Sequence, residues 1–155
     1  MNSPDGVKLP KTLYHGSSHR IETLKPMPSK VLDGEKAVFG TNLKVIAAAF
    51  IPKWSDMDFD MGYHNGRMYL IERYPNAFDK LKNVSGYIYS MSSDGFQSDA
   101  RLGMKAHEFI NRQPVSITKV QKIGDVFKFL SKHTDQMKLI TYIQVLDTLA
   151  EAGVL

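Results

Sequence analysis

Short apolar runs separated by turn-forming residues restrict what this chain can fold into. Runs rich in β-branched and aromatic residues stand at 12–15, 37–41, 86–91, 108–111 and 115–123. Glycine, proline, asparagine or serine stands next to most of these runs, which is typical of strands and not of long helices. The sequence therefore predicts a fold in which strands dominate.

Two further patterns complete the expected elements. Asn65-Gly66 separates MGYH from RMYLIE and predicts a tight hairpin, because both turn residues tolerate positive φ. The segment 42–50 predicts a helix with Asn42 as its N-cap, followed by Pro52. At the end of the chain helical spacing dominates, and we expect a C-terminal helix within 133–155. Its apolar residues recur at three- and four-residue steps: Leu139, Ile140, Ile143, Leu146, Leu149 and Ala150.

This order of elements predicts an α+β fold, because strands and helices do not alternate as repeated βαβ units. The 155 residues are enough to bury one continuous core, so we expect a single domain over 1–155. Residues 1–11 mix polar and turn-forming types and predict a loose lead-in. Residues 23–36 show no hydrophobic period and contain two prolines and a glycine, so we expect a long surface loop there.

Composition excludes some chemistries. The chain has 20 Lys+Arg and 16 Asp+Glu, a net charge of +4, with the basic residues scattered, so anionic ligands are only weakly favoured. Without cysteine there is no disulfide or thiolate metal site, and the five histidines lack HExxH spacing, so we expect no metal. No leader-like segment opens the chain and no apolar run approaches the roughly 18 residues of a membrane helix. We therefore expect a cytoplasmic protein without a membrane partner.

Three motifs stand out from this background. YHGSS occupies 14–18 and puts a titratable ring at a strand end, directly before a glycine. VFGT occupies 38–41 and leads into an alanine-rich segment that ends in Phe50. HEFIN occupies 107–111.

In this order the three motifs resemble the catalytic segments of the ADP-ribosyltransferase fold, particularly the His-Tyr-Glu branch that includes diphtheria toxin and the poly(ADP-ribose) polymerases. The resemblance spans 13–115. It implies split mixed and antiparallel β-sheets with peripheral helices. It also implies that the protein cleaves the nicotinamide–ribose bond of NAD, its substrate, and transfers ADP-ribose to an acceptor. The acceptor class stays open between protein, nucleic acid and small molecule.

The resemblance also implies roles for individual residues. Cleavage of NAD leaves positive charge on the ribose, which calls for a nearby carboxylate. Glu108 would supply that carboxylate, as in glycoside cleavage, and His15 would orient the same ribose. The backbone of Gly16, unobstructed by a Cβ, would contact the nicotinamide carboxamide. The remaining residues implied to bind NAD are Ser17, Thr41 and the aromatic pair Phe39 and Phe50.

Phe39 and Phe50 occupy positions at which the resemblance leads us to expect tyrosines that sandwich nicotinamide. Phenylalanine keeps the π face, and stacking contributes about 0.5–1.5 kcal/mol beyond buried area. It lacks the hydroxyl. Arginine-specific relatives carry a second glutamate two positions before the catalytic one, and Ala106 occupies that place here, so arginine modification is less expected.

Other interpretations stay open at the level of sequence. A histidine at a strand end and phenylalanines in a strand and a helix are ordinarily structural. His107 is expected to face away from Glu108 and to be structural. For the whole chain the alternatives are an NAD glycohydrolase, an RNA 2′-phosphotransferase-like enzyme, and a non-catalytic binding module of the same fold, because a fold does not fix an activity.

Overall fold

Strand β1 (Thr12–Ser17) lies inside the largest sheet of the computed structural model, which describes residues 9–64, 67–104 and 106–154. Strand β7 (Gly86–Ser92) pairs antiparallel with β1 from Thr12↔Ser92 to Ser17↔Tyr87, and β10 (Lys119–Ile123) pairs with the far edge of β7. The strands predicted at 12–15 and 86–91 are confirmed, each slightly longer than expected.

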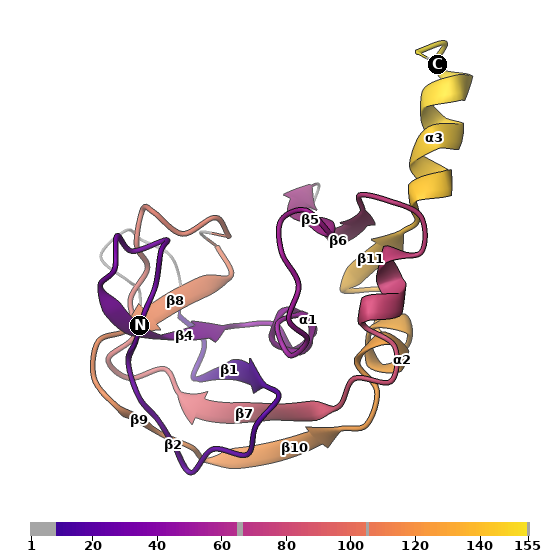
Figure 1. Cartoon of the computed structure of the whole chain (residues 1–155). Coiled ribbons are helices and arrows are strands. Elements are labelled where there is room, and N and C mark those ends of the chain that lie inside the picture. Colours follow the sequence, from indigo (N-terminus) through magenta and orange to yellow (C-terminus); the bar gives the residue numbers. More distant parts are fainter. Residues whose placement is uncertain (1–8, 65–66, 105, 155) are drawn as a thin grey trace.

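The other edge of β1 meets β4 (Lys36–Thr41) at one pair only, Tyr14↔Thr41. Beyond that pair β4 continues with β8 (Glu108–Asn111), in register from Val38↔Asn111 to Thr41↔Glu108, and with the short β3 (Met27–Pro28). Both predicted strands, 37–41 and 108–111, are confirmed. The two strands therefore stay neighbours in one six-stranded sheet but are joined at a single residue pair, and we call this junction the β1–β4 split (Figure 1).

A second sheet consists of β5 (Phe59–His64), β6 (Arg67–Glu72) and β11 (Met137–Ile140). The pairing of β5 with β6 down to His64↔Arg67 confirms the predicted hairpin, although Asn65 and Gly66 themselves lie outside the described residues. β11 adds to β6 in parallel. A small ribbon of β2 (Thr23–Leu24) and β9 (Val115–Ser116) completes the strands of the described chain.

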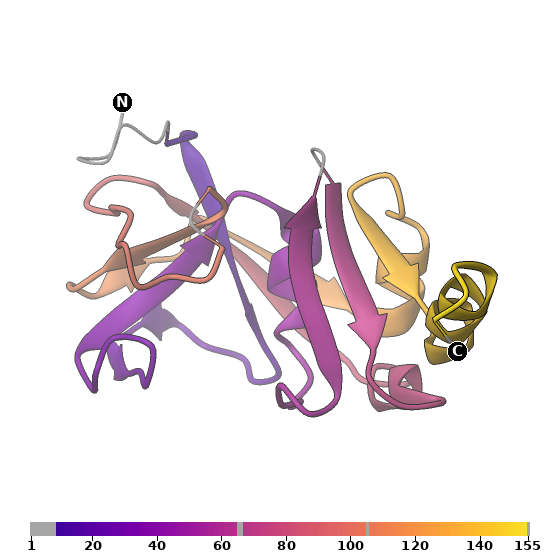
Figure 2. The same cartoon turned by 90° about the horizontal axis from the view of Figure 1, so that it is seen from above.

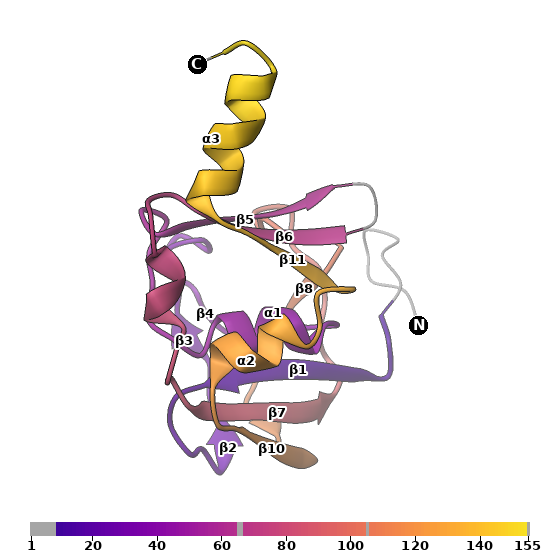
Figure 3. The ribbon, with the colours of Figure 1, turned by 90° about the vertical axis from the view of Figure 1, so that its right-hand side faces the viewer.

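Helix α1 (Lys44–Ala49) fills the space between the two sheets, as seen from the side in Figure 3. All of its residues from Val45 to Ala49 are buried, which explains its alanine content: small side chains let sheets and helix approach closely. Helix α2 (Val126–Ser131) packs beside it, and Asp125 caps α2 by accepting from the Lys128 amide at 3.1 Å. The β5–β6 hairpin lies over α1, which it partly covers in the view from above (Figure 2). The fold is α+β with mixed and antiparallel sheets, as predicted.

Several expectations about individual elements were wrong. The C-terminal helix predicted within 133–155 is shorter, because Met137–Ile140 forms β11 and only Tyr142–Glu151 forms helix α3. The spacing of the apolar residues in 137–140 is compatible with a helix or a strand. The segment forms a strand because it pairs with β6. Helix α2 and the 3₁₀-helix η1 (Ala77–Lys80) were not predicted. The segment 115–123 is two strands, β9 and β10.

Two local interpretations also change. Asn42 does not cap α1: the N-cap position is Leu43, which makes no side-chain cap bond, while the Asn42 side chain turns to the chain before β8. Residues 23–36 are not simply a surface loop, because they contain β2 and β3 and the fully buried Leu32. In the described part of the chain no helix is long and apolar enough to cross a membrane.

Candidate active site

A cavity of about 510 Å³ lies where β1 and β4 part. Six of the seven residues predicted to act on NAD line it: His15, Gly16, Phe39, Thr41, Phe50 and Glu108. They come from β1, β4, the end of α1 and β8, elements that are far apart in the sequence. Ser17, the seventh, is not among the lining residues. Its hydroxyl oxygen accepts from the amide of His19 at 3.1 Å and so shapes the turn after β1.

His15 is held by the backbone of the neighbouring strand. Its Nδ1 lies 2.8 Å from the carbonyl oxygen of Phe39. A carbonyl only accepts, so Nδ1 carries the proton and donates, which leaves Nε2 as an acceptor. Burial lowers the pKa of His15 below its ordinary value, against the opposing effect of that hydrogen bond. The ring is therefore a neutral acceptor near pH 7.

The carboxylate of Glu108 has no paired cation in the described part of the chain. It is the first residue of β8, lies opposite Thr41 of β4, and its amide donates to the carbonyl of Met104 at 2.9 Å. Burial raises the pKa of its side chain, partly offset by a hydrogen bond with the Met104 backbone. No ion pair to Glu108 forms within the described ranges. A half-buried carboxylate without a cation partner among the described residues interacts strongly with any positive charge that develops beside it.

Gly16 has a packing role that the sequence did not reveal. A Cβ at this position would lie 1.9 Å from the carbonyl oxygen of Ala47 and 2.7 Å from the carbonyl carbon. Both atoms belong to the backbone of α1, which has no room to move between the sheets. Glycine is thus required for α1 to lie against β1, independently of any ligand.

The two phenylalanines differ in their surroundings. Phe39 is half-buried and packs against a small cluster that includes Leu32 and Ile110. Phe50 is 49% exposed, and its ring stacks on Trp54 with centroids 5.9 Å apart and planes 9° from parallel. The indole of Trp54 donates to the carbonyl of Ala49 at 2.6 Å, which holds the ring at the C-terminal end of α1.

Trp54 was missed in the sequence, although it is the chain's single tryptophan and stands four residues after Phe50. Thr41 has a structural role besides its place on the cavity wall, since its hydroxyl oxygen accepts from the amide of Leu43 at 3.2 Å and forms the turn into α1. The two residues therefore contact the backbone at opposite ends of the helix, Thr41 just before α1 and Trp54 at its last residue.

His107 is structural in its contacts, as expected, but it precedes β8. Its Nδ1 lies 2.9 Å from Oδ1 of Asn42, whose amide nitrogen donates to the carbonyl of Ala106 at 3.4 Å. Its ring also packs on Tyr63, with centroids 4.9 Å apart. Burial lowers the pKa of His107, and its Nε2 is buried without a hydrogen-bond partner among the described residues. These contacts tie the start of β8, and so Glu108, to the start of α1.

A turn after β3 forms one wall of the cavity through Ser29 and Val31. The turn closes on itself, with the Gly34 amide donating to the carbonyl of Ser29 at 2.8 Å. Arg101 then ties it down: its guanidinium lies 2.6 Å from a carboxylate oxygen of Glu35 and 2.9 Å from one of Asp99. We call this group, Arg101 with Glu35 and Asp99, the clasp. The paired carboxylates have pKa values lowered chiefly by hydrogen bonds with Arg101.

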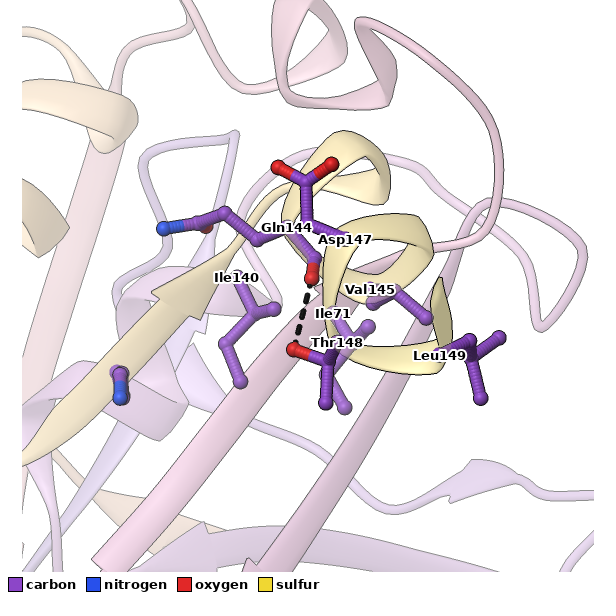
Figure 4. A pocket seen from close by; sticks show the side chains of 8 residues that line it. Ile71, Ile140, Gln144, Val145, Asp147, Thr148 and Leu149 are labelled. Atoms are coloured by element: carbon purple, nitrogen blue, oxygen red, sulfur yellow. Dashed lines mark hydrogen bonds between the residues drawn. The ribbon is translucent and has the colours of Figure 1, made fainter. Parts of the chain in front are cut away.

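Another hollow, of about 490 Å³, lies between α3 and the sheet (Figure 4). Its walls are mostly apolar, including Ile71, Ile140 and Val145, and the hydroxyl of Thr148 is used within α3, where it donates to the carbonyl of Gln144 at 2.9 Å. No predicted site residue lies there. No cluster of three His, Cys, Asp or Glu side chains suited to a metal ion occurs in the part of the chain with described coordinates.

Comparisons of the chain with models of protein families, with curated proteins and with solved structures found no match. A functional interpretation therefore depends on the geometry of the cavity at the β1–β4 split.

Proposed function

We propose that this protein is an NAD-dependent ADP-ribosyltransferase with an ADP-ribosyltransferase-like fold. One observation carries the proposal: three motifs separated in the sequence bring His15, Phe39, Phe50 and Glu108 to one cavity. The split between β1 and β4 supports it too, because it opens the sheet at the glycine expected to contact nicotinamide. A volume of about 510 Å³ suits a ligand of the size of NAD's nicotinamide and ribose portion.

Different residues of the cavity bind different parts of NAD. Phe39 and Phe50 hold the flat nicotinamide ring, and the backbone of Gly16 meets its carboxamide. The free Nε2 of His15 accepts a hydrogen bond from a hydroxyl of the adjoining ribose. That interaction needs an unprotonated Nε2. Burial favours the neutral ring, and the bond to the Phe39 carbonyl places the remaining proton on Nδ1. Ser29 and Val31 enclose the ligand from the side of the clasp.

The reaction breaks the bond between ribose C1′ and the ring nitrogen of nicotinamide. The bonding electrons leave with the ring, which departs neutral, and positive charge develops on the ribose. The carboxylate of Glu108 stabilises that charge and accepts a hydrogen bond from the ribose. A nucleophile then forms a new bond to C1′ and loses a proton. Water in this place would give free ADP-ribose, so transferase and glycohydrolase share every step before the attack.

Release of nicotinamide tests the proposal. The purified protein is incubated with NAD and free nicotinamide is measured, with Glu108→Gln purified in parallel to exclude a contaminating enzyme. We expect release by the parent and far slower release by the variant. NAD that binds but is never cleaved would instead identify the non-catalytic binding module, whereas equal release by both proteins would exclude Glu108 as the catalytic carboxylate.

A further inference from the structure

Helix α3 (Tyr142–Glu151) stands away from the rest of the molecule, as Figures 1 and 3 show from two directions. None of its residues is buried, and Ile143 is 63% exposed. Helices shorter than about 12–15 residues are marginal in water on their own, because packing of an apolar face supplies most of their stability. A ten-residue helix of this kind therefore needs a cover that the single chain does not give it.

The hollow of about 490 Å³ beside α3 is an open corner between this helix and the second sheet (Figure 4). Val145 and Leu149 of α3 line one side of it. Ile71 of β6 and Ile140 of β11, which are paired in register, line the other. Met68 of β6 is buried on the opposite face of the sheet. The view from above looks onto the outer face of β5 and β6, and no other described element lies over it (Figure 2). We call this hollow the α3 corner.

The charges of α3 are opposite in sign to the net charge of the chain. The helix contains Asp147 and Glu151 and no lysine or arginine, whereas the whole chain carries +4. Lys138 of β11 is exposed and lines the α3 corner. Neither Lys138 nor Glu151 forms an ion pair with another residue at a described position. The corner thus offers a cation and an anion that are both free to pair.

The two ends of α3 are stabilised unequally. At its base, next to β11, Thr141 and Gln144 form a capping box, and the Tyr142 amide donates to the carboxylate of Glu72 at 3.0 Å. At its tip Glu151 stands in the last turn, where the helix dipole already places partial negative charge and where no basic residue is present. A cation from outside the helix would stabilise the tip.

We propose that the α3 corner binds a second copy of this chain about a two-fold axis, with the two α3 helices side by side and antiparallel. Each helix is about 15 Å long, so the tip of one reaches the base of the other. Glu151 of each copy then lies beside Lys138 of its partner. Both ion pairs form at once, because a two-fold contact uses the same patch on each copy. The apolar side chains of the two corners cover one another.

Other occupants match the α3 corner less well. Helices that lie on a lipid surface are rich in lysine and arginine on their polar face, and α3 has neither. A nucleic acid would be repelled by Asp147 and Glu151. A second copy matches the apolar lining and also the order of the charges, with the cation at the base and the anion at the tip.

Sedimentation equilibrium of the purified full chain over a range of protein concentrations tests this arrangement. The test variants are Lys138→Glu, Glu151→Lys and the double variant Lys138→Glu/Glu151→Lys. The matched controls are Lys119→Glu and Glu22→Lys, which change the net charge by the same amounts at exposed positions outside the α3 corner. Hydrogen exchange of the α3 amides is measured at low and at high protein concentration.

We expect the parent to form a weak dimer, because two short helices and two sheet faces make a small interface. Each single reversal places like charges side by side and should raise the dissociation constant of the dimer about tenfold or more. The double variant restores opposite charges in reversed order, so it should dimerise as the parent and the controls do. The α3 amides of the parent should exchange more slowly at high concentration, where the helix is covered.

Each other outcome overturns the inference. A parent that stays monomeric up to about 1 mM would exclude a second copy as the occupant. A dimer that neither single reversal weakens would place the interface elsewhere on the molecule. A double variant that dimerises no better than the single variants would reject the antiparallel pairing of Lys138 with Glu151. A monomer that floats with phosphatidylcholine vesicles would identify a lipid surface as the cover of α3.

Discussion

The imidazole Nδ1 of His15 donates to the backbone carbonyl of Phe39 across the point at which β1 and β4 part, at 2.8 Å. This one bond connects two of the three motifs, because His15 belongs to the first and Phe39 to the second. It fixes the ring's tautomer and leaves Nε2 as an acceptor. The proposed chemistry needs His15 neutral and Glu108 ionised at the same time, and burial acts against ionisation of both.

This requirement predicts the pH dependence of NAD cleavage. The pKa of His15 is lowered from 6.5 and the pKa of Glu108 is raised from 4.5, in each case chiefly by burial. Activity falls with pH as either group gains a proton. In a profile of kcat/KM for NAD, the step due to Glu108 should therefore lie above pH 4.5 and the step due to His15 below pH 6.5.

The residual activity of Glu108→Gln identifies which step is which, since the variant should lack the Glu108 step and retain that of His15. A parent profile that stays flat down to pH 4.5, the ordinary value for a glutamate, would contradict the role assigned to this carboxylate.

Gly16→Ala tests the close contact of β1 with α1. The added Cβ would overlap the carbonyl of Ala47, at 1.9 Å, so the helix or the strand must shift. Overpacking of this kind costs about 1–3 kcal/mol, and we expect the free energy of unfolding, measured by urea titration, to fall by that amount. Gly62→Ala is the control, because a Cβ there meets nothing within 4 Å. Equal loss in the two variants would show that glycine itself, and not its contact, matters.

Much of the strand framework was predictable from the sequence, for a physical reason. Where a short apolar run is rich in aromatic and β-branched residues and bordered by turn residues, as at 86–91, a strand is favoured, and the structure has β7 there. At 137–140 the run is ambiguous, and a parallel partner contributed by β6, far away in the sequence, decides between strand and helix. Local patterns do not contain that partner.

In the candidate site, too, local motifs were predictable from the sequence and contacts between distant segments were not. The motifs indicated which residues to consider, and six of the seven line one cavity. Their supporting contacts were not predictable: the Phe39 carbonyl as the partner of His15, Trp54 under Phe50, and the clasp formed by Arg101 all join distant segments. Ser17 is not among the residues that line the cavity, and its hydroxyl oxygen accepts from the His19 amide in the local turn, a contact that the motif did not predict.

The clasp predicts how the turn at 29–35 behaves. Arg101→Gln removes the ion pairs to Glu35 and Asp99, so amides of the turn, including that of Gly34, should exchange hydrogen faster and the KM for NAD should rise. Bound NAD should slow the exchange again. Lys119→Gln removes an exposed cation outside the clasp and should change neither property. Exchange that is equally slow in parent and Arg101→Gln would mean that the buried Leu32 and the remaining pair between Arg112 and Glu35 hold the turn without Arg101.

Phe50 is expected to act through its flat face. It is 49% exposed at the cavity while its ring stacks on Trp54, so a substitution there disturbs little of the core. Phe50→Tyr should keep NAD affinity, whereas Phe50→Leu should weaken it by about 0.5–1.5 kcal/mol through loss of stacking. Calorimetric titration with NAD gives both values. If the leucine and tyrosine variants bind alike, Phe50 serves packing only.

Glu108→Gln is the most direct test of the enzyme. Glutamine keeps the shape and the hydrogen bonds but carries no charge to oppose the cation on the ribose, so nicotinamide release should fall by about 10²–10³ while NAD affinity stays similar. The variant should also be no less stable. A carboxyl group whose pKa is raised by burial destabilises the fold when ionised, so replacing it should keep or raise the melting temperature at pH 8, and this gain should vanish in acid, where the parent's carboxyl is neutral. Slow release together with a lowered melting temperature would indicate that Glu108 holds the structure and not the transition state.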